Sequence, residues 1–247
     1  MRTLPYLQLV GSLLYLSTMT RPDISYIVGV LCQFMSSPSL QCFEAAQSVL
    51  LYCGKTSELK IHYRGGHKFH VPDALLAASP DITNKYGLHA YSDSSWNSPK
   101  STYGYCVFAA GGLISYCSRK NNVIADSAAL AEYSGVSAAT KELLFDRNLF
   151  NEIGRTVSGP IVLGVDNTAS ISIAEKEGVT KLNKHFDFAA SRVREEVSCL
   201  RVRLMHVGTA EMTADIFTKP LDAATFLRLR ERLITKDINT KVMLRRN

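Results

Sequence analysis

The sequence predicts a mixed α/β domain that follows a short helical segment. Two observations support this division. In residues 5–64, apolar residues such as Tyr6, Val10 and Leu13 recur at the three- and four-residue spacing of a helix. From Leu88 onward, short β-rich runs alternate with helical patterns, as in a sheet with helices packed on its faces. The 247 residues are 46% hydrophobic and 20% charged, so the chain can bury a sizeable core.

The elements of the α/β domain are expected in a definite order. A short strand that ends in an acid comes first, and two β-rich runs then form a hairpin around Gly111 and Gly112. The unbroken apolar run after Pro160 predicts a buried central strand. The expected strands cover residues 88–93, 103–109, 113–117, 161–165 and 201–207, and the expected helices cover 127–150 (with Asp126 as N-cap), 168–174, 186–197, 213–219 and 223–233.

The chain divides into four expected parts. They are a helical segment over residues 1–64, a linker over 65–86, the α/β domain over 87–221, and a C-terminal helix with a basic tail over 222–247. The tail has seven basic and two acidic residues from Phe226 onward, so most of the net charge of +6 lies there. A basic tail suits contact with nucleic acid, and equally a solvated chain end.

Composition argues against several classes of protein. No run reaches about 18 apolar residues, so we expect no membrane span. The first residues lack the small-residue cleavage site of a signal peptide. The six cysteines form no CxxC pair, which predicts reduced and partly buried thiols in an intracellular protein rather than a zinc site or a disulfide scaffold.

Four acidic residues stand where predicted elements begin or end. Asp93 closes the first strand, Glu132 lies in the first turns of the long helix, Asp166 follows the buried strand, and Asp215 opens a short helix. Carboxylates at such positions can converge, but they repel one another unless a cation is bound. Hard oxygen ligands suit Mg²⁺ or Mn²⁺, and two such ions can activate water for attack on a phosphodiester.

Each acid also has an ordinary structural explanation. Asp215 can stabilise a helix start through the dipole, and Asp166 with Asn167 can form a turn between a strand and a helix. Asp93 can be a loop acid that precedes Ser94. The spacing alone leaves the metal site and these structural roles open.

Several sequence runs together resemble one family. They are YLQLVGSLLYLSTMTRPDISYIVGVLCQFMSSP at 6–38, AYSDSSW at 90–96, STYGYCVFAAGGLISYCSRK at 101–120, SAALAEY at 127–133, VDNTASISIA at 165–174, NKHFDF at 183–188 and HVGTAEMTADIFTKPL at 206–221. From residue 90 onward they resemble, in order, the ribonuclease H region of copia-type LTR-retrotransposon Pol polyproteins. The first run resembles the connection segment that follows the reverse transcriptase palm in the same polyproteins. The resemblance covers about residues 5–234.

The resemblance implies a ribonuclease H-like fold, which is a five-stranded mixed sheet with flanking helices. It implies an endonuclease that cleaves the RNA strand of RNA–DNA hybrids in reverse transcription with two Mg²⁺ or Mn²⁺ ions. The family's four acids fall on Asp93, Glu132, Asp166 and Asp215. Asp93 and Asp166 would ligate both ions, Glu132 would ligate one and orient the water, and Asp215 would complete the other.

The implied partners are the RNA–DNA hybrid and the reverse transcriptase palm region of the same polyprotein, with no membrane. The implied location is the cytoplasm, within virus-like particles, or the nucleus. The residues expected to contact the hybrid are Arg119, Lys120, Lys184 and His185 through phosphates, and Ser94 and Asn167 through 2′-hydroxyls. Ordinary solvated charges remain an alternative for the basic residues.

His206 has two interpretations. It lies nine residues before Asp215, so it could assist proton transfer or product release. Its alternation with Val202 and Leu204 instead favours a strand histidine that faces the core.

The chain departs from the family pattern, which motivates an alternative function. Ser95 stands where a second acid is usual, Leu130 replaces a glutamate, and no Tyr-x-Asp-Asp run of a polymerase occurs. The alternative is a non-catalytic nucleic-acid-binding or assembly module, a retroelement Pol fragment without the palm; a relic with no function is a third reading. The apolar stripes of residues 5–53 would pack on that palm, so we expect the isolated chain to be poorly soluble.

Overall fold

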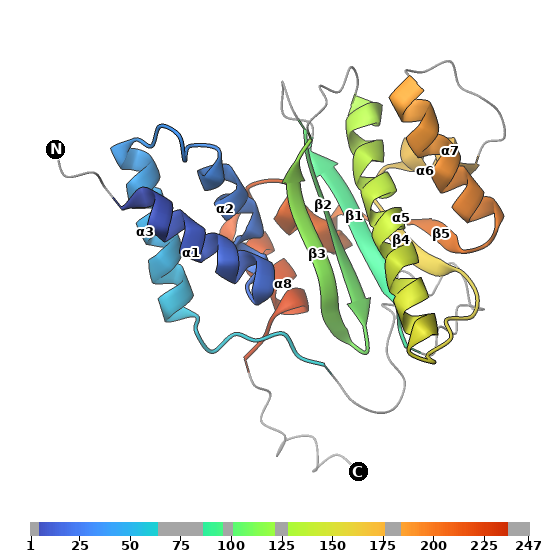
Figure 1. Ribbon diagram of the computed structural model, residues 1–247, viewed down its shortest axis with the longest axis horizontal. Helices are drawn as coiled ribbons and strands as arrows, with labels where there is room; N and C mark the ends of the chain where they lie inside the picture. The colour runs from blue at the N-terminus through green and yellow to red at the C-terminus, as the bar shows by residue number, and fades with distance from the viewer. Residues whose placement is uncertain (1–4, 64–85, 96–100, 122–127, 176–183, 237–247) are drawn as a thin grey trace, which may run out of the picture. The chain divides into compact units, whose positions relative to one another are not determined.

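The computed structural model describes residues 5–63, 86–95, 101–121, 128–175 and 184–236, and the side chains of 128–132 and 184–189 lie outside that description (Figure 1). The expected linker over 65–86 and the expected cap Asp126 therefore fall almost wholly outside it. The chain splits into two compact units, one of residues 1–62 with 220–247 and one of residues 63–219. Within the described residues, no helix is both long and apolar enough to cross a membrane.

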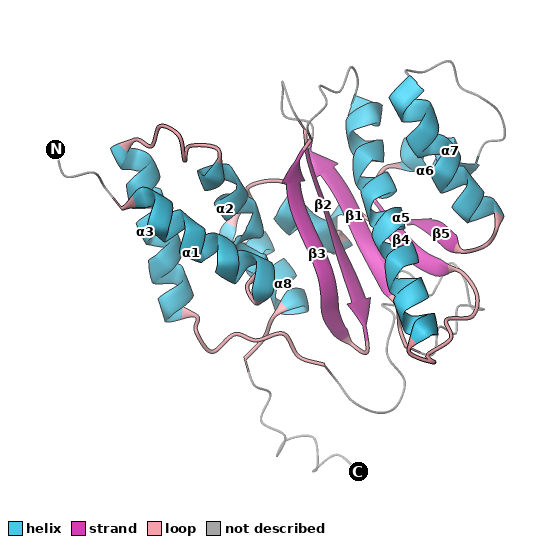
Figure 2. Ribbon diagram, in the orientation of Figure 1, coloured by secondary structure: helices cyan, strands magenta, loops and turns pink. Residues whose placement is uncertain are grey.

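A five-stranded mixed sheet forms the frame of the second unit (Figure 2). The strand order is β3-β2-β1-β4-β5, with β1 antiparallel to β2 and parallel to β4. This is the sheet that the sequence predicted. The strands are β1 (His89–Ser95), β2 (Thr102–Ala109), β3 (Gly112–Lys120), β4 (Ile161–Val165) and β5 (Val202–His206).

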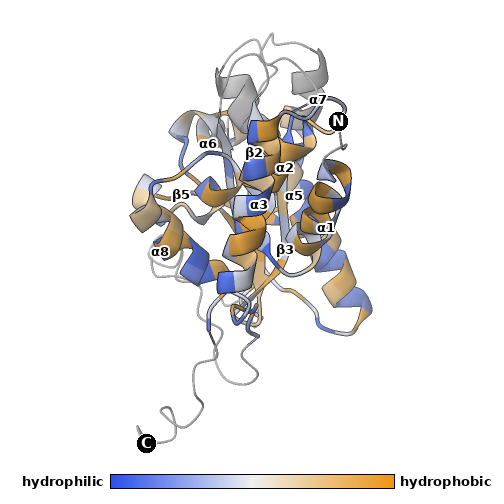
Figure 3. Ribbon diagram, turned by 90° about the vertical axis from the view of Figure 1, so that its left-hand side faces the viewer, coloured by the Kyte–Doolittle hydropathy of each residue, from blue (hydrophilic) through white to orange (hydrophobic). Residues whose placement is uncertain are grey.

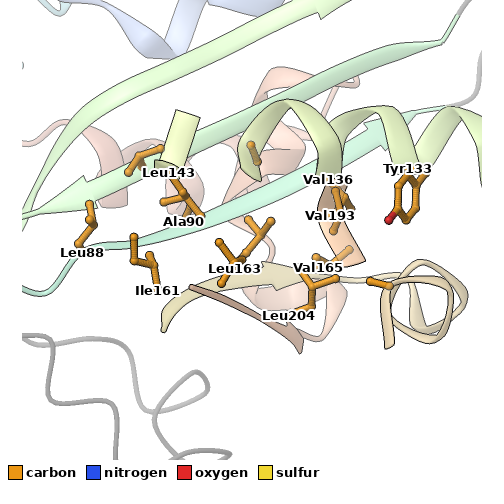
Figure 4. Close-up of a cluster of buried hydrophobic side chains, with 14 of the residues drawn as sticks. Leu88, Ala90, Tyr133, Val136, Leu143, Ile161, Leu163, Val165, Val193 and Leu204 are labelled. Atoms are coloured by element: carbon orange, nitrogen blue, oxygen red, sulfur yellow. The ribbon is translucent and has the colours of Figure 1, made fainter. Parts of the chain in front are cut away.

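Three helices, α5 (Ala128–Glu152), α6 (Thr168–Glu175) and α7 (Lys184–Ser198), flank this sheet. The long helix α5 packs along β1 and β2, and α7 packs beside it. Figure 4 labels buried apolar side chains of the core, among them Val136 of α5, Leu163 of β4 and Val193 of α7. β4 is buried along its whole length, which explains its unbroken apolar run.

Two glycines let neighbouring elements approach the central strands closely. A Cβ at Gly135 in α5 would lie 2.5 Å from the Ser94 hydroxyl and 2.9 Å from the Asp93 carbonyl oxygen. A Cβ at Gly104 in β2 would lie 2.5 Å from the Phe217 Cβ. Such distances leave no room for a side chain, so both contacts depend on glycine.

The short helical turn expected near residue 213 is the 3₁₀ helix η3 (Thr213–Phe217), preceded by another such turn, η2 (Thr209–Glu211). η3 is buried throughout and packs on β1 and β2. The Ser118 hydroxyl of β3 donates to the Phe217 carbonyl oxygen over 2.6 Å, which fixes the end of η3 to the sheet. The helix ends two residues earlier than expected.

The first unit is helical and contains both ends of the described chain. Its elements are α1 (Tyr6–Met19), η1 (Pro22–Ile24), α2 (Ser25–Cys32), α3 (Leu40–Lys55) and α8 (Ala223–Leu233). Apolar residues of α1, α2 and α3 form its core. α8 packs with the N-terminal helices: the Tyr52 ring meets Phe226 edge to face, and Arg230 donates to the Tyr52 hydroxyl.

A buried ion pair stabilises the turn between α1 and α2. Arg21 and Asp23 share two hydrogen bonds of 2.9 Å, and the Tyr52 hydroxyl donates to the same Asp23 carboxylate over 2.6 Å. The charges are buried but paired, which is the condition under which burial is tolerated. These contacts explain the polar run Thr-Arg-Pro-Asp between two apolar stripes.

Large apolar side chains remain exposed on the helical unit. Leu7 is 54% exposed, Tyr15 66% and Leu51 64%, and the hydrophobic residues of α1 and α3 can be followed in Figure 3. Such side chains favour association in water.

Replacing Leu7 and Leu51 together with Gln should raise the soluble yield of the chain several-fold, because both side chains are exposed. The melting temperature should change little, since exposed substitutions usually alter stability by less than about 0.5 kcal/mol. Soluble yield and thermal unfolding measure this. Leu13→Gln is the control, because Leu13 is fully buried and its loss should unfold the unit. An unchanged soluble yield for the double variant would show that the exposed side chains of Leu7 and Leu51 do not limit solubility.

Candidate metal centre

Three of the four acids expected to act together meet at one end of the sheet. Asp93 is near the end of β1, Asp166 directly follows β4, and Asp215 lies in η3. One carboxylate oxygen from each can be chosen so that all three lie within 4.8 Å of one another. β1 and β4 are adjacent and parallel, so their carboxyl ends open at the same edge, and η3 brings the third acid to it.

Burial and mutual repulsion shape the acidity of this cluster. Asp93 is 6% and Asp215 3% exposed, whereas Asp166 is half-buried. Burial raises the pKa of Asp166, and the nearby charge of Asp93 raises it further. Burial likewise raises the pKa of Asp215 to about 6, although Lys219 opposes the rise.

The two residues after η3 supply partners for these carboxylates. The Thr218 hydroxyl donates to Asp93 Oδ2. Lys219 Nζ lies 2.9 Å from Asp215 Oδ1 and 3.7 Å from Asp93 Oδ2. Burial by itself lowers the pKa of Lys219, but Asp93 and Asp215 outweigh it and the pKa is raised.

The donor set fits a divalent cation. Three carboxylates so close together give a concentrated negative charge, and hard oxygen ligands of this kind suit Mg²⁺ or Mn²⁺. Asp93 also has a hydroxyl partner in Thr218, as metal-ligating carboxylates usually have. Asp93, Asp166 and Asp215 are therefore the described residues that could hold such ions.

Glu132 lies in α5, but its side chain is outside the described part of the chain. Its position is one helical turn before Gly135, the residue at which α5 touches β1 beside Asp93. The helix backbone at residue 132 is thus near the end of β1. Membership of Glu132 in the cluster remains a prediction.

The chain is 32% identical over 225 residues to a retrovirus-related Pol polyprotein from transposon RE1 of Arabidopsis thaliana; the match covers 90% of this chain and 14% of that polyprotein. The resemblance to copia-type Pol polyproteins is confirmed. The chain thus spans about one seventh of the length of this relative. No protein-family model matches the chain.

Two further similarities complete the comparison. The chain is 35% identical over 150 residues to secreted RxLR effector protein 161 of Plasmopara viticola, covering 59% of this chain and 93% of that protein. Among solved structures it is similar to a ribonuclease H1 from Halobacterium salinarum, at 18% identity and a TM-score of 0.39, over 53% of this chain and 93% of that chain.

The two polar candidates, Ser94 and Asn167, differ in their surroundings. Ser94 follows Asp93 along β1, so its side chain points to the opposite face, where it is buried against Gly135. Ser94 is 8% exposed, and its contact with a 2′-hydroxyl stays a prediction. The Asn167 side-chain oxygen accepts from the backbone N–H groups of Ala169 and Ser170 and caps α6, which leaves its amide nitrogen as a donor.

The basic candidates at the end of β3 lie at the acidic end of the sheet. The register of the strands places Arg119 and Lys120 across β2 from Ser94 and Ser95, and both side chains are exposed. Two strand spacings separate them from β1, roughly 10 Å, which is within the reach of a nucleic-acid backbone. Lys184 and His185 begin α7, and their side chains lie outside the described part of the chain.

His206 is exposed at the end of β5, so the interpretation of it as a core histidine is wrong. Val202 and Leu204 are buried, but β5 reaches the end of the core at its last residue. The alternation of buried and exposed side chains therefore does not extend to His206. His206 pairs in register with Val165, the residue before Asp166, and its charge lowers the pKa of Asp166 slightly against the larger effects that raise it.

Four residues that shape the centre had no role in the sequence analysis. Gly104 and Gly135 make the close contacts, and Thr218 and Lys219 contact the acids. The spacing of Lys219 four residues after Asp215 is a signal that could have found it. The glycines carry no comparable local signal, because their role depends on elements far apart in the sequence.

Replacing Gly104 with Ala should move η3 and Asp215 away from Asp93, because the new methyl group would overlap the Phe217 Cβ. We expect a loss of stability of about 1–3 kcal/mol and weaker Mg²⁺ binding, measured by chemical unfolding and calorimetric titration. Gly11→Ala is the control, since an added Cβ there would meet no atom within 4 Å apart from its own stretch of α1, and the change should be neutral or stabilising. Equal stability of Gly104→Ala and wild type would contradict this packing.

The metal-free protein should lose stability as the pH rises from about 4 to above 6. The pKa of Asp215 is about 6 in the folded chain and near 3.8 when unfolded, so the folded state holds the extra proton in this range. Addition of Mg²⁺, which binds the ionised carboxylates, should raise the melting temperature more at pH 8 than at pH 5.

Asp146, buried on α5 with a pKa raised to about 7, contributes in the same direction. Asp146→Asn should therefore serve as the background for the pH series. Asp215→Asn in that background should reduce the remaining slope, and the raised pKa of Asp166 accounts for the rest. A metal-free melting temperature that increases from pH 5 to pH 8 in this background would contradict the effect of Asp215.

Proposed function

We propose that the chain is a ribonuclease H-type endonuclease that hydrolyses the RNA strand of RNA–DNA hybrids in retrotransposon reverse transcription. The observation that carries the proposal is the meeting of Asp93, Asp166 and Asp215 at one end of a five-stranded mixed sheet. The similarity to Pol polyproteins over 90% of the chain supports it. Hydrolysis of a phosphodiester is the chemistry that clustered hard ligands best serve.

Each residue of the centre has a proposed task. Two divalent ions, when bound, lower the pKa of a water and stabilise the leaving oxygen. Asp93, Asp166 and Asp215 would hold them, with Glu132 as a fourth ligand. Thr218 keeps the Asp93 carboxylate in position through its hydroxyl. The parallel pairing of β1 with β4 keeps Asp93 and Asp166 close, and η3 adds Asp215.

The hybrid would bind across the end of the sheet. Arg119 and Lys120 supply exposed positive charge on the same end as the acids, as phosphate contacts require. Asn167 adds an amide donor beside Asp166. Lys184 and His185 would extend this surface.

The proposed partner is the reverse transcriptase palm region of the same polyprotein, and the proposed location is the cytoplasm, in virus-like particles, or the nucleus.

A second candidate is a non-catalytic nucleic-acid-binding or assembly module. The similarity to nearly the whole length of an effector protein of Plasmopara viticola favours it, because related sequence exists there as a short separate protein. Under this proposal the acids would bind no ion needed for chemistry, and the basic residues would carry the interaction.

Cleavage of a labelled RNA–DNA hybrid with Mg²⁺ separates the two candidates. Wild type should give products with 3′-hydroxyl and 5′-phosphate ends, and Asp166→Asn should lower the rate more than about a hundredfold, because it removes a metal ligand. Asp146→Asn is the matched control, since that acid is buried on α5 outside the cluster. Hybrid binding without cleavage by the wild-type chain would favour the module.

A further inference from the structure

One positive charge already lies among the acids. The Lys219 ammonium is 2.9 Å from one Asp215 oxygen and 3.7 Å from one Asp93 oxygen. Its side chain is one-third exposed, whereas the two carboxylate side chains are 4% and 5% exposed. The lysine therefore reaches into the buried cluster from the solvent side.

The placement of Lys219 matters because the same carboxylates are the candidate metal ligands. Three carboxylates within 4.8 Å of one another repel strongly in a buried site, and an ammonium between two of them offsets part of that repulsion. A divalent cation supplies the same compensation with twice the charge. The lysine and the metal thus stabilise the same acids. When one of them is bound, less repulsion among the carboxylates remains for the other to offset.

We propose that Lys219 is an internal counter-ion that stabilises the metal-free centre and leaves the carboxylates when divalent cations bind, thereby setting the metal affinity. This inference rests on the proposed metal centre. The flexible four-carbon stem of a lysine can swing into solvent without movement of the backbone. The Thr218 hydroxyl bond to Asp93 does not compete, because a hydroxyl brings no charge.

The proposal assigns two opposite effects to one side chain. With the ammonium in place, the metal-free folded chain is stabilised against the repulsion among its acids. The cost of breaking the contacts with Asp215 and Asp93 is then subtracted from the free energy of metal binding. The positioning role of Lys219 is therefore visible in metal binding and in metal-free stability, without reference to cleavage.

Lys219→Met tests both effects, because Met keeps an unbranched apolar stem and removes the charge. By calorimetric titration, the Mg²⁺ affinity should increase by about threefold to tenfold over wild type. The metal-free melting temperature should fall, and the rise on adding Mg²⁺ should exceed that of wild type. Lys141→Met is the matched control, since Lys141 is exposed on α5 and should change neither quantity. Equal or weaker Mg²⁺ affinity of Lys219→Met would overturn the proposal.

A measurement on the wild-type chain keeps the proposal testable if the variant does not fold. Acetylation of lysines, followed by mass spectrometry, should modify Lys219 several-fold faster with Mg²⁺ than without it, because the displaced ammonium enters solvent. Lys141 should react equally in both conditions. A Lys219 rate that is unchanged or lower with Mg²⁺ would overturn the displacement.

The outcomes for the proposed function and for this inference can be told apart. Failure of the proposed metal centre appears as absence of Mg²⁺ binding and of cleavage in the wild-type chain. Failure of the inference alone appears as Mg²⁺ binding and cleavage by wild type, with the same affinity in Lys219→Met.

Discussion

Repulsion among three carboxylates within 4.8 Å of one another is the constraint to which the sheet, the helices and the connecting turns must conform. Parallel pairing of β1 with β4 brings Asp93 and Asp166 to one edge. Two glycines then allow α5 and η3 to press against the central strands from opposite faces. This packing holds the three like charges close together in the folded chain.

The residues around the cluster reduce the repulsion among its carboxylates but do not remove it. A threonine hydroxyl and a lysine ammonium, both directly after η3, contact the acids, and the pKa of Asp215 is still raised to about 6. The three carboxylates carry more negative charge than one lysine neutralises, and this excess is the physical reason that the site suits divalent cations. The buried Asp23 carboxylate is paired with Arg21, whereas the three clustered acids keep an excess of negative charge.

The chain joins this centre to a helical unit built from both of its ends. Lys219 is the last residue of the sheet unit, and Pro220 is the first residue of the returning C-terminal segment. α8 then packs through Phe226 and Arg230 on Tyr52. The acidic end of the sheet is therefore covalently adjacent to the segment that completes the helical unit, and that unit keeps large apolar side chains exposed.

The sequence by itself determined the elements and the family resemblance, because hydrophobic periodicity and short motifs are local properties. β4 and α8 appear at the expected residues, and the acids stand at the expected ends of elements. Only the tertiary structure decided which groups meet: Thr218 and Asp93 are 125 residues apart, α8 joins the N-terminal helices, and His206 ends in solvent. Such contacts depend on strand order and on close packing at Gly104 and Gly135, and neither leaves a periodic signal in the chain.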